Sequence, residues 1–265
     1  MDSESKLKRL LDDLAGMGSV LIAYSGGVDS SLLSVLASEV PGITVKCVLL
    51  DSPLVPRRMV DEAIDTAERY GFDCGIMDFA ILEDDEFVKN PKNRCYICKK
   101  ASARILKRLA RELGMIYIAD GTNTSDLNEY RPGLAAGNEE GIAHPFVDAG
   151  ISKDDIRKIA AGRSLAFCTK PSAACLASRL PYGDVITEDK LGMIEEAEDY
   201  LIKKGFSQVR VRIHGRIARI ELDPSEAAGA LANARAICER FEEIGFTYVT
   251  LDLAGYRTGS MDMVA

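Results

Sequence analysis

Residues 23–30 read Ala-Tyr-Ser-Gly-Gly-Val-Asp-Ser and lie between two different hydrophobic patterns. The apolar run at 19–24 predicts a strand, and the amphipathic run at 30–40 predicts a helix. Two adjacent glycines, Gly26 and Gly27, let the backbone approach a ligand closely because they carry no Cβ. The loop amides and the helix dipole would then favour a phosphate group. The stretch therefore predicts a phosphate-binding loop at a strand-to-helix turn.

Strand and helix patterns alternate along the first 120 residues or so. Strands are predicted at 19–24, 43–50, 73–79 and 115–119, and helices at 4–17, 30–40, 56–70 and 95–113. This alternation predicts an α/β fold, a parallel sheet with helices on both faces. A further helix at 153–163 opens on a capping box formed by Ser152 and Asp155.

The rest of the chain has a different rhythm. A loop-rich segment at 168–183 is followed by a helix at 187–204, strands at 208–213 and 217–222, a helix at 224–244 and a strand at 248–253. We therefore expect two domains. Residues 1–184 would carry the phosphate loop, and residues 185–265 would form a small α+β domain for substrate binding and oligomerisation.

The composition is that of an ordinary globular protein, with 265 residues, 47% hydrophobic and 28% charged. No apolar run reaches the ~18 residues that cross a membrane, and the polar N-terminus lacks a signal sequence, so we expect a cytoplasmic protein without a membrane partner. The net charge of −8 disfavours a large nucleic-acid surface. Seven cysteines favour metal binding or thiol chemistry over a disulfide framework.

Polar or glycine-containing segments follow the predicted strands, where ligands bind in an open parallel sheet. They are the phosphate loop, Asp51–Val55, residues 76–78 and Asp120–Asn123. We expect all four segments to line one nucleotide-sized crevice. Asp29 and Asp126 are candidate Mg²⁺ ligands, because Mg²⁺ prefers carboxylate and phosphate oxygens.

Cysteines give a second set of candidates. Cys95 and Cys98 lie three residues apart at the start of a predicted helix, where the helix dipole and neighbouring cations favour thiolates. With Cys175 from the loop-rich segment, three thiolates would suffice to hold three irons of a 4Fe–4S cluster and leave one iron open. Structural zinc with Cys168 as a fourth ligand, and a redox pair of Cys95 and Cys98, stay open as alternatives.

Arginines crowd the predicted C-terminal strands. They are Arg210, Arg212, Arg216, Arg219 and Arg257. Arg210 and Arg212 are two residues apart, so they project from one face of their strand. Such a set suits a phosphate or carboxylate ligand. The alternative is a solvated sheet face whose arginines pair with Glu221 and Asp223.

The run Ser-Gly-Gly-Val-Asp-Ser at 25–30 resembles the PP-loop of the N-type ATP pyrophosphatases, which cleave ATP between its α- and β-phosphates. Further motifs make the chain resemble the LarE family of PP-loop sulfur transferases nearly end to end. They are Asp51-Ser52-Pro53, Asn93-Arg94-Cys95-Tyr96, Asp120-Gly121-Thr122-Asn123, Tyr130-Arg131-Pro132-Gly133, Lys170 to Arg179, Pro181-Tyr182-Gly183 and Gly255-Tyr256-Arg257-Thr258-Gly259-Ser260.

The resemblance implies that ATP and Mg²⁺ adenylylate the carboxylates of pyridinium-3,5-biscarboxylic acid mononucleotide. Pyrophosphate would leave, and sulfur would turn the carboxylates into thiocarboxylates for the nickel-pincer cofactor of lactate racemase. The implied ATP-binding residues are Ser25, Gly26, Gly27, Asp29, Ser30, Leu50, Ser52, Ile76, Gly121, Thr122 and Lys170. Catalytic roles would fall to Cys175, Cys95, Cys98, Lys99 and Asp29, and the substrate phosphate to Ser178, Arg210, Arg212 and Arg257.

Within this family the sulfur comes from a cysteine at the position of Cys175 or from a sulfide bound to a 4Fe–4S cluster. Because Cys95 and Cys98 accompany Cys175, the resemblance favours the cluster, with these three as its ligands. It also implies a homo-oligomer, either a dimer or a hexamer.

Three rival functions remain. A tRNA thiolation enzyme would need a basic surface, which the net charge of −8 disfavours. Ammonia-using synthetases of the same superfamily would not need the three cysteines. A nucleotide sensor with structural zinc would bind ATP without releasing pyrophosphate.

Overall fold

The computed structural model describes residues 2–128, 132–171, 174–257 and 261. Several residues of the motifs quoted above lie outside this range: Tyr130, Arg131, Ser172, Ala173, Thr258, Gly259 and Ser260.

Contacts divide the chain into two compact units. The N-terminal unit comprises Met1–Ser52, Arg57–Ile81 and Asn93–Ala173, and the C-terminal unit comprises Pro53–Pro56, Leu82–Lys92 and Ala174–Ala265. The loop from Ala174 onward thus groups with the C-terminal unit. A functional domain boundary at residue 184 stays a prediction.

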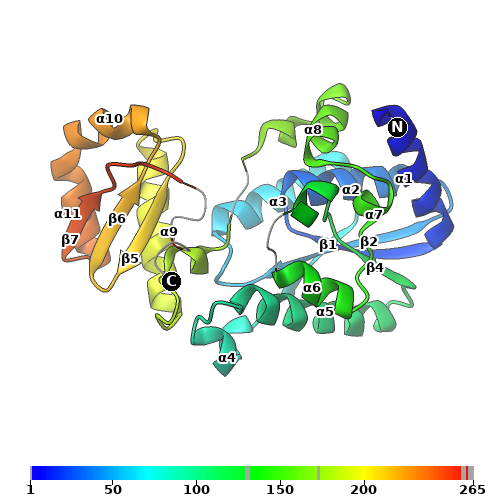
Figure 1. Ribbon diagram of the computed structural model, residues 1–265, viewed down its shortest axis with the longest axis horizontal. Helices are drawn as coiled ribbons and strands as arrows, with labels where there is room; N and C mark the ends of the chain where they lie inside the picture. Colours follow the sequence, from blue (N-terminus) through cyan, green and yellow to red (C-terminus); the bar gives the residue numbers. More distant parts are fainter. Residues whose placement is uncertain (1, 129–131, 172–173, 258–260, 262–265) are drawn as a thin grey trace. The chain divides into compact units, whose positions relative to one another are not determined.

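A parallel four-stranded sheet forms the centre of the N-terminal unit (Figure 1). Its strands are β1 (Ser19–Tyr24), β2 (Thr44–Asp51), β3 (Cys74–Asp78) and β4 (Tyr117–Ala119), in the order β3-β2-β1-β4. Ser19 pairs with Thr44, and Cys47 pairs with Cys74. The predicted parallel sheet is confirmed. Because the strands are parallel, the four segments that follow them begin at one edge of the sheet.

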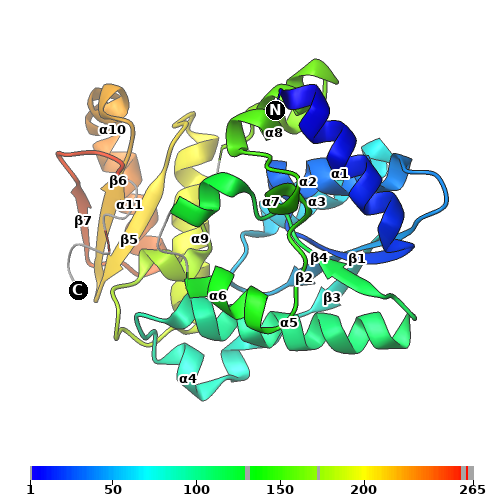
Figure 2. The same cartoon turned by 45° about the vertical axis from the view of Figure 1, so that its right-hand side comes forward.

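Helices cover both faces of this sheet. Figures 1 and 2 show α2 (Val28–Glu39) and α3 (Arg57–Tyr70) on one side and α5 (Arg94–Glu112) on the other. Other helices of the unit are α1 (Ser3–Met17), α6 (Pro132–Glu139), α7 (Pro145–Asp148) and α8 (Lys153–Gly162). On the α5 side, Leu106 and Ala110 pack against Leu21 and Val48 of the sheet. Neither α6 nor α7 was among the predicted helices.

The predicted capping box at the start of α8 is confirmed. Ser152 Oγ accepts a hydrogen bond from Asp155 N, and the Asp155 carboxylate accepts one from Ser152 N. The same carboxylate accepts from Lys6 Nζ of α1 at 2.7 Å. This cap therefore also ties the first helix of the chain to α8.

A three-stranded sheet organises the C-terminal unit, as expected. Its strands are β5 (Arg210–His214), β6 (Ile217–Glu221) and β7 (Tyr248–Leu251), with β5 and β6 antiparallel and β6 and β7 parallel. Helices α9 (Glu188–Lys203) and α11 (Ala234–Ile244) pack against it, and α4 (Asp85–Val88) belongs to the same unit.

One continuous helix over 224–244 is wrong. The segment forms a 3₁₀ turn at Pro224–Glu226, then α10 (Ala227–Ala232), then α11. The break falls at Asn233, whose Nδ2 donates to Gly229 O at 2.9 Å. Asparagine competes for backbone groups in this way, so a local bond interrupts the helix.

Within the described residues, no helix combines the length and the apolar character needed to cross a membrane.

Candidate functional site

Serine hydroxyls hold the glycine loop between β1 and α2 in shape. Ser30 Oγ accepts from Ser25 N at 3.2 Å and donates to Gly27 O at 3.2 Å. Gly26 has φ +69°, and a Cβ there would lie 2.5 Å from Ala63 Cβ of α3, so only glycine fits. Gly27, the N-cap of α2, has no side chain to bond the first amides of that helix. The loop therefore has the form of an anion site at a helix N-terminus.

The turn after β4 lies against this loop. A Cβ on Gly121 would lie 2.7 Å from Ser30 N. Asn123 Nδ2 donates to Asp29 Oδ2 at 3.2 Å, and Asn123 N donates to Asp126 Oδ2 at 3.0 Å. The structure thus links the two predicted Mg²⁺ ligands, Asp29 and Asp126, through one asparagine.

Lys170 reaches the same loop from a distant part of the sequence. Its Nζ donates to Gly26 O at 3.1 Å and forms an ion pair with Glu62 Oε2 at 2.8 Å. Arg157 of α8 holds the backbone around it, because its guanidinium donates to the carbonyl oxygens of Cys168 and Lys170 at 3.1 and 3.3 Å. Contacts within the N-terminal unit therefore place the predicted nucleotide-binding lysine at the glycine loop.

A buried carboxylate, Asp120, collects three donors near the same turn. Lys99 Nζ donates to Oδ2 at 2.6 Å, while His144 Nδ1 and Thr122 N donate to Oδ1 at 2.7 and 3.1 Å. Burial alone would raise the pKa of Asp120, but the hydrogen bonds and charges of His144 and Lys99 outweigh it and hold the pKa well below its ordinary value. Sequence reasoning assigned His144 no place in the site.

The residues proposed to contact the base lie on β2 and the edge strand β3. Cys47 N donates to Asp73 O and Phe79 N to Asp51 O, so alternate residues of β3 bond to β2. This alternation turns the N–H and C=O of Ile76 to the free edge, where they suit the edge of a nucleobase.

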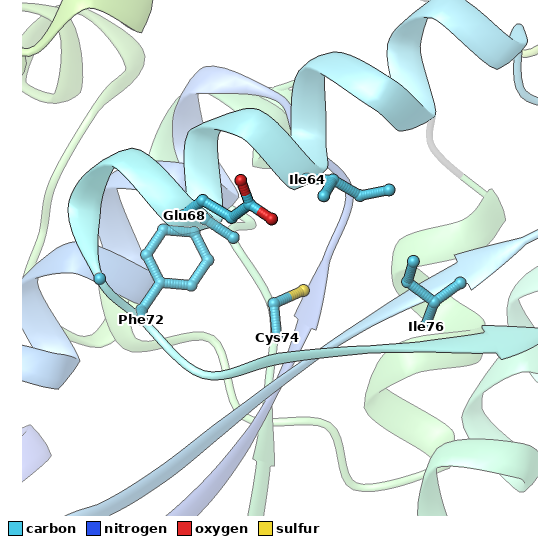
Figure 3. Close-up of a pocket in the computed structure, with 7 residues that line it drawn as sticks. Ile64, Glu68, Phe72, Cys74 and Ile76 are labelled. Atoms are coloured by element: carbon cyan, nitrogen blue, oxygen red, sulfur yellow. The ribbon is translucent and has the colours of Figure 1, made fainter.

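A pocket of about 190 Å³ opens beside this edge strand, between α3 and β3 (Figure 3). It is lined by Ile64, Ala67, Glu68, Gly71, Phe72, Cys74 and Ile76. Ile76 as a whole residue is 53% exposed. Leu50, by contrast, packs its side chain against the core beneath α5. Ser52 is buried, and its carbonyl accepts from Arg57 at 2.9 Å.

The three predicted cluster ligands belong to different units. Cys95 and Cys98 lie in the first two turns of α5, and Cys175 directly precedes the 3₁₀ turn Leu176–Arg179 of the C-terminal unit. All three are thiols, which is the donor chemistry that an iron–sulfur cluster takes. Among the described residues, however, no three metal-binding side chains come together. The cluster therefore stays a prediction.

Cysteines of the sheet are not candidates for the thiolate role. Burial raises the pKa of Cys47 to about 12 and that of Cys74 to about 11. Both side chains therefore remain protonated thiols near neutral pH.

Arg212 lies buried at the centre of the predicted phosphate site in the C-terminal unit. Its Nε and Nη2 donate to Glu221 Oε2 at 3.1 and 2.8 Å, and its Nη1 donates to Ser178 O at 3.0 Å. Glu221 also pairs with Arg219 at 3.3 Å. Asp223 instead caps the next turn, accepting from Ser225 N at 2.9 Å. The alternative of a solvated sheet face is met in part: Arg212 and Arg219 pair with Glu221, but Arg212 is buried, and no pairing with Asp223 is seen among the described contacts.

Arg179 brings Cys175 into this site. Its Nη1 donates to Cys175 O at 3.1 Å and to Ser178 Oγ at 3.0 Å, and its Nε and Nη2 each bond Glu198 at 2.9 Å. Both members of the Arg179–Glu198 pair are 2% exposed. Sequence reasoning missed this pair. Its signal is Glu198, a charged residue on the apolar stripe of α9 between Ile194 and Leu201.

Two further arginines lie at the edge of the site. Arg210 lies 5.3 Å from the centre of the Tyr256 ring, and burial together with the charge of Arg179 lowers the pKa of Arg210. Arg257 lies 3.9 Å from Asp252. Arg210, Arg212 and Ser178 therefore share one region of the C-terminal unit.

A parallel sheet in the order β3-β2-β1-β4, with the loop Ser-Gly-Gly-Val-Asp-Ser opening α2, is consistent with an α/β protein of the PP-loop class. No family model matches the chain. It is 32% identical over 130 residues to one subunit of a glutamine-hydrolysing GMP synthase of Thermoplasma volcanium, covering 48% of this chain and 42% of that protein.

Two other relatives match almost the whole chain. An uncharacterised protein of Synechocystis is 38% identical over 263 residues, covering 98% of each chain. The pyridinium-3,5-bisthiocarboxylic acid mononucleotide synthase of Lactiplantibacillus plantarum is 34% identical over 259 residues, covering 97% of this chain and 94% of that enzyme. The chain belongs to the LarE family of PP-loop sulfur transferases.

Proposed function

We propose that this protein is an ATP-dependent sulfur transferase of nickel-pincer nucleotide biosynthesis. Its substrate is pyridinium-3,5-biscarboxylic acid mononucleotide, whose carboxylates it converts to thiocarboxylates. The similarity to the Lactiplantibacillus plantarum synthase along 97% of the chain carries the proposal. The glycine loop with Lys170 and Gly121 against it supports the nucleotide half of the reaction.

The first step joins the substrate carboxylate to AMP and releases pyrophosphate. A carboxylate is a poor acyl donor because its oxygen is a poor leaving group. Joining that oxygen to AMP forms a mixed anhydride, from which AMP is a good leaving group. The first amides of α2 face the departing phosphates. Asp29 and Asp126 would hold Mg²⁺, which supplies positive charge to the pyrophosphate. Lys99 and Lys170 neutralise charge around the α-phosphate.

The C-terminal unit binds the mononucleotide phosphate. Among the described contacts, Arg212 uses three of its five N–H groups on Glu221 and Ser178, which fixes its plane and leaves two N–H groups for a ligand. Arg210 and Ser178 contribute beside it, and Arg257 lies at the rim. Glu221 thus orients the arginine and has no role as a base.

The second step brings sulfur to the adenylylated carboxylate and releases AMP. We propose that Cys95, Cys98 and Cys175 hold a 4Fe–4S cluster, which would supply a bound sulfide. The support is the donor type and the α5 position of the first two cysteines. The alternative source is the sulfur of Cys175 itself, lost as that residue becomes dehydroalanine.

Anaerobic purification tests the sulfur source. A brown protein with iron–sulfur absorbance supports the cluster, and Cys95→Ala should then lose colour and sulfur insertion while pyrophosphate release persists. Cys238→Ala, on α11, is the matched control and should keep both. A colourless wild-type protein that loses one sulfur from Cys175 per turnover would establish the sacrificial route instead.

Pyrophosphate release tests the function as a whole. We expect release only when ATP, Mg²⁺ and the pyridinium mononucleotide are all present, with sulfur replacing oxygen in the product by mass spectrometry. Release that depends on tRNA, or ATP binding without any release, would overturn the proposal. The first outcome would point to tRNA thiolation and the second to a nucleotide sensor.

We also propose that the protein acts in the cytoplasm as a homo-oligomer, a dimer or a hexamer, without a nucleic-acid or membrane partner. Seven cysteines and a net charge of −8 support this setting. Light scattering after size exclusion tests the oligomeric state.

A further inference from the structure

His144 occupies an unusual position for a helix-capping residue. It is the N-cap of α7, directly before Pro145, yet its side chain makes no cap hydrogen bond. The ring instead lies buried between two polar partners: Nδ1 is 2.7 Å from Asp120 Oδ1, and Nε2 is 3.0 Å from Asn138 Oδ1. The side chain therefore serves Asp120 and α6 in place of its own helix.

The protons of this contact follow from the charge of Asp120. An ionised carboxylate only accepts hydrogen bonds, so Nδ1 of His144 carries a proton and donates it. Lys99 occupies the other oxygen at 2.6 Å. With Oδ1 filled by His144 and Thr122, the carboxylate plane is fixed, and Lys99 is held at Oδ2. Among the described contacts, one of the three ammonium N–H groups is committed to Asp120, so the others can face a ligand.

Packing around these groups leaves little freedom. A Cβ on Gly137 of α6 would lie 3.4 Å from Lys99 Cε and 3.6 Å from His144 Cε1. Backbone bonds fix the approach of His144 to the end of β4, because Ala143 N donates to Ile118 O at 2.8 Å and Asp120 N donates to Ala143 O at 3.1 Å. The ring, the carboxylate and the ammonium thus form one braced unit.

We infer that His144 is a positioning residue for the adenylylation step. It acts through Asp120, holding the Lys99 ammonium and the turn at Thr122 in the geometry that the nucleotide requires. This inference rests on the proposed function for the role of Lys99. The chain of contacts itself, from His144 to Asp120 to Lys99, rests on the structure alone.

Two amide substitutions separate positioning from mere core filling. The amide nitrogen of His144→Asn takes the place of Nδ1 and can still donate to Asp120. The longer His144→Gln places its amide near the position of Nε2, and His144→Ala has no donor. If His144 only fills the core, the activity of the variants should follow side-chain volume, with Gln above Asn and Asn above Ala. If His144 positions Asp120, the activity of the Asn variant should exceed that of both the Gln and the Ala variant.

Steady-state pyrophosphate release is the activity readout. We expect kcat of His144→Asn within about threefold of wild type, and kcat of His144→Gln and His144→Ala lower by about tenfold or more, with KM for ATP nearly unchanged. Lys107→Ala, on the same helix as Lys99, removes an ion pair to Glu140; it is the control and should match wild type. Equal kcat in the Asn and Gln variants, or a change confined to KM, would overturn the inference.

A second readout does not need turnover. Acetic anhydride labelling followed by mass spectrometry reports how accessible each lysine is, with Lys107 as the internal reference. We expect Lys99 to label several-fold faster in His144→Ala and His144→Gln than in wild type and His144→Asn. Unchanged Lys99 labelling in all variants would refute the positioning role. Absence of pyrophosphate release in wild type, with this labelling pattern intact, would instead reject the proposed function.

Discussion

Gly121 lies so close to Ser30 that a Cβ on the glycine would come within 2.7 Å of Ser30 N and 2.9 Å of Asp29 C. Both of these are backbone atoms at the start of α2, so no flexible side chain can yield to relieve the contact. The turn after β4 and the phosphate loop, more than ninety positions apart in the printed sequence, therefore share one packed junction.

Gly121→Ala should push this turn away from the phosphate loop. We expect ATP affinity to fall by about tenfold or more, because the first amides of α2 lose their alignment. Isothermal titration with ATP and Mg²⁺ measures the change. Gly192→Ala in α9, where a Cβ meets nothing within 4 Å, is the control. It should keep affinity and gain about 0.5–1 kcal/mol of stability; similar affinity losses in both variants would contradict the junction.

Lys170→Met should weaken ATP binding by about tenfold while leaving the fold intact. The ammonium contacts the loop at Gly26 O, and its loss removes positive charge beside the phosphates. Lys158→Met on the exposed face of α8 provides a lysine lost from the same region without contact to the loop. Titration calorimetry measures the affinity for ATP, and a melting curve shows whether each variant is still folded. Equal affinities for the two variants would exclude a nucleotide role for Lys170.

Asp155→Asn should make the free energy of unfolding less dependent on pH in the acidic range. Burial alone would raise the pKa of Asp155, but hydrogen bonds from Lys6, Ser152 and Ser3 outweigh it, so the folded pKa lies below the ordinary value. The resulting stabilisation is complete above the unfolded pKa of about 4 and is lost as pH falls through the folded pKa. In urea unfolding at pH 7, the free energy of unfolding of wild type should therefore exceed that of Asp155→Asn by about 1 kcal/mol or more. The gap should narrow below about pH 4. A constant gap from neutral to acidic pH would count against this linkage.

Glu221→Ala should destabilise the C-terminal unit strongly. The glutamate is fully buried and is the carboxylate partner of buried Arg212. Removing one partner of a buried pair leaves an uncompensated charge and costs about 3–5 kcal/mol. The exposed i,i+4 pair of Arg235 with Glu239 is the comparison, and Glu239→Ala should cost no more than about 0.5 kcal/mol. Unfolding curves that rank the two variants equally would show that Arg212 finds another counter-charge.

Much of the fold follows from local patterns. The four parallel strands, the helices from α1 to α3, α5, α8 and α9, and the capping box at Ser152 all match the sequence-based prediction. These elements have strong hydrophobic periods or explicit cap residues, which act over a few neighbouring positions. The error at Asn233 has the opposite cause, because a helical pattern ran on through a residue that bonds its own backbone.

The candidate site was harder to anticipate. The expected loop is formed by Ser25, Gly26, Gly27 and Ser30. It could be predicted because its shape depends on glycines and serines that are close neighbours in the sequence. The role of His144 could not be predicted in the same way, because no sequence pattern around a single histidine before a proline indicates which residue it will contact. The Arg179–Glu198 pair left only a faint trace, a glutamate within an apolar stripe.

The PP-loop, the alternation of strands and helices, and the presence of thiols and arginines that the proposed chemistry needs all follow from the order of amino acids along the chain. These properties reside in neighbouring residues, so propensity and periodicity suffice to read them. Three contacts, by contrast, became apparent in the folded molecule alone: Asp120 joins Lys99 to His144, Lys170 contacts Gly26, and Glu221 binds Arg212. Each of those contacts depends on packing that brings separate segments together, and the burial that makes it strong exists only once the sheets and helices have assembled.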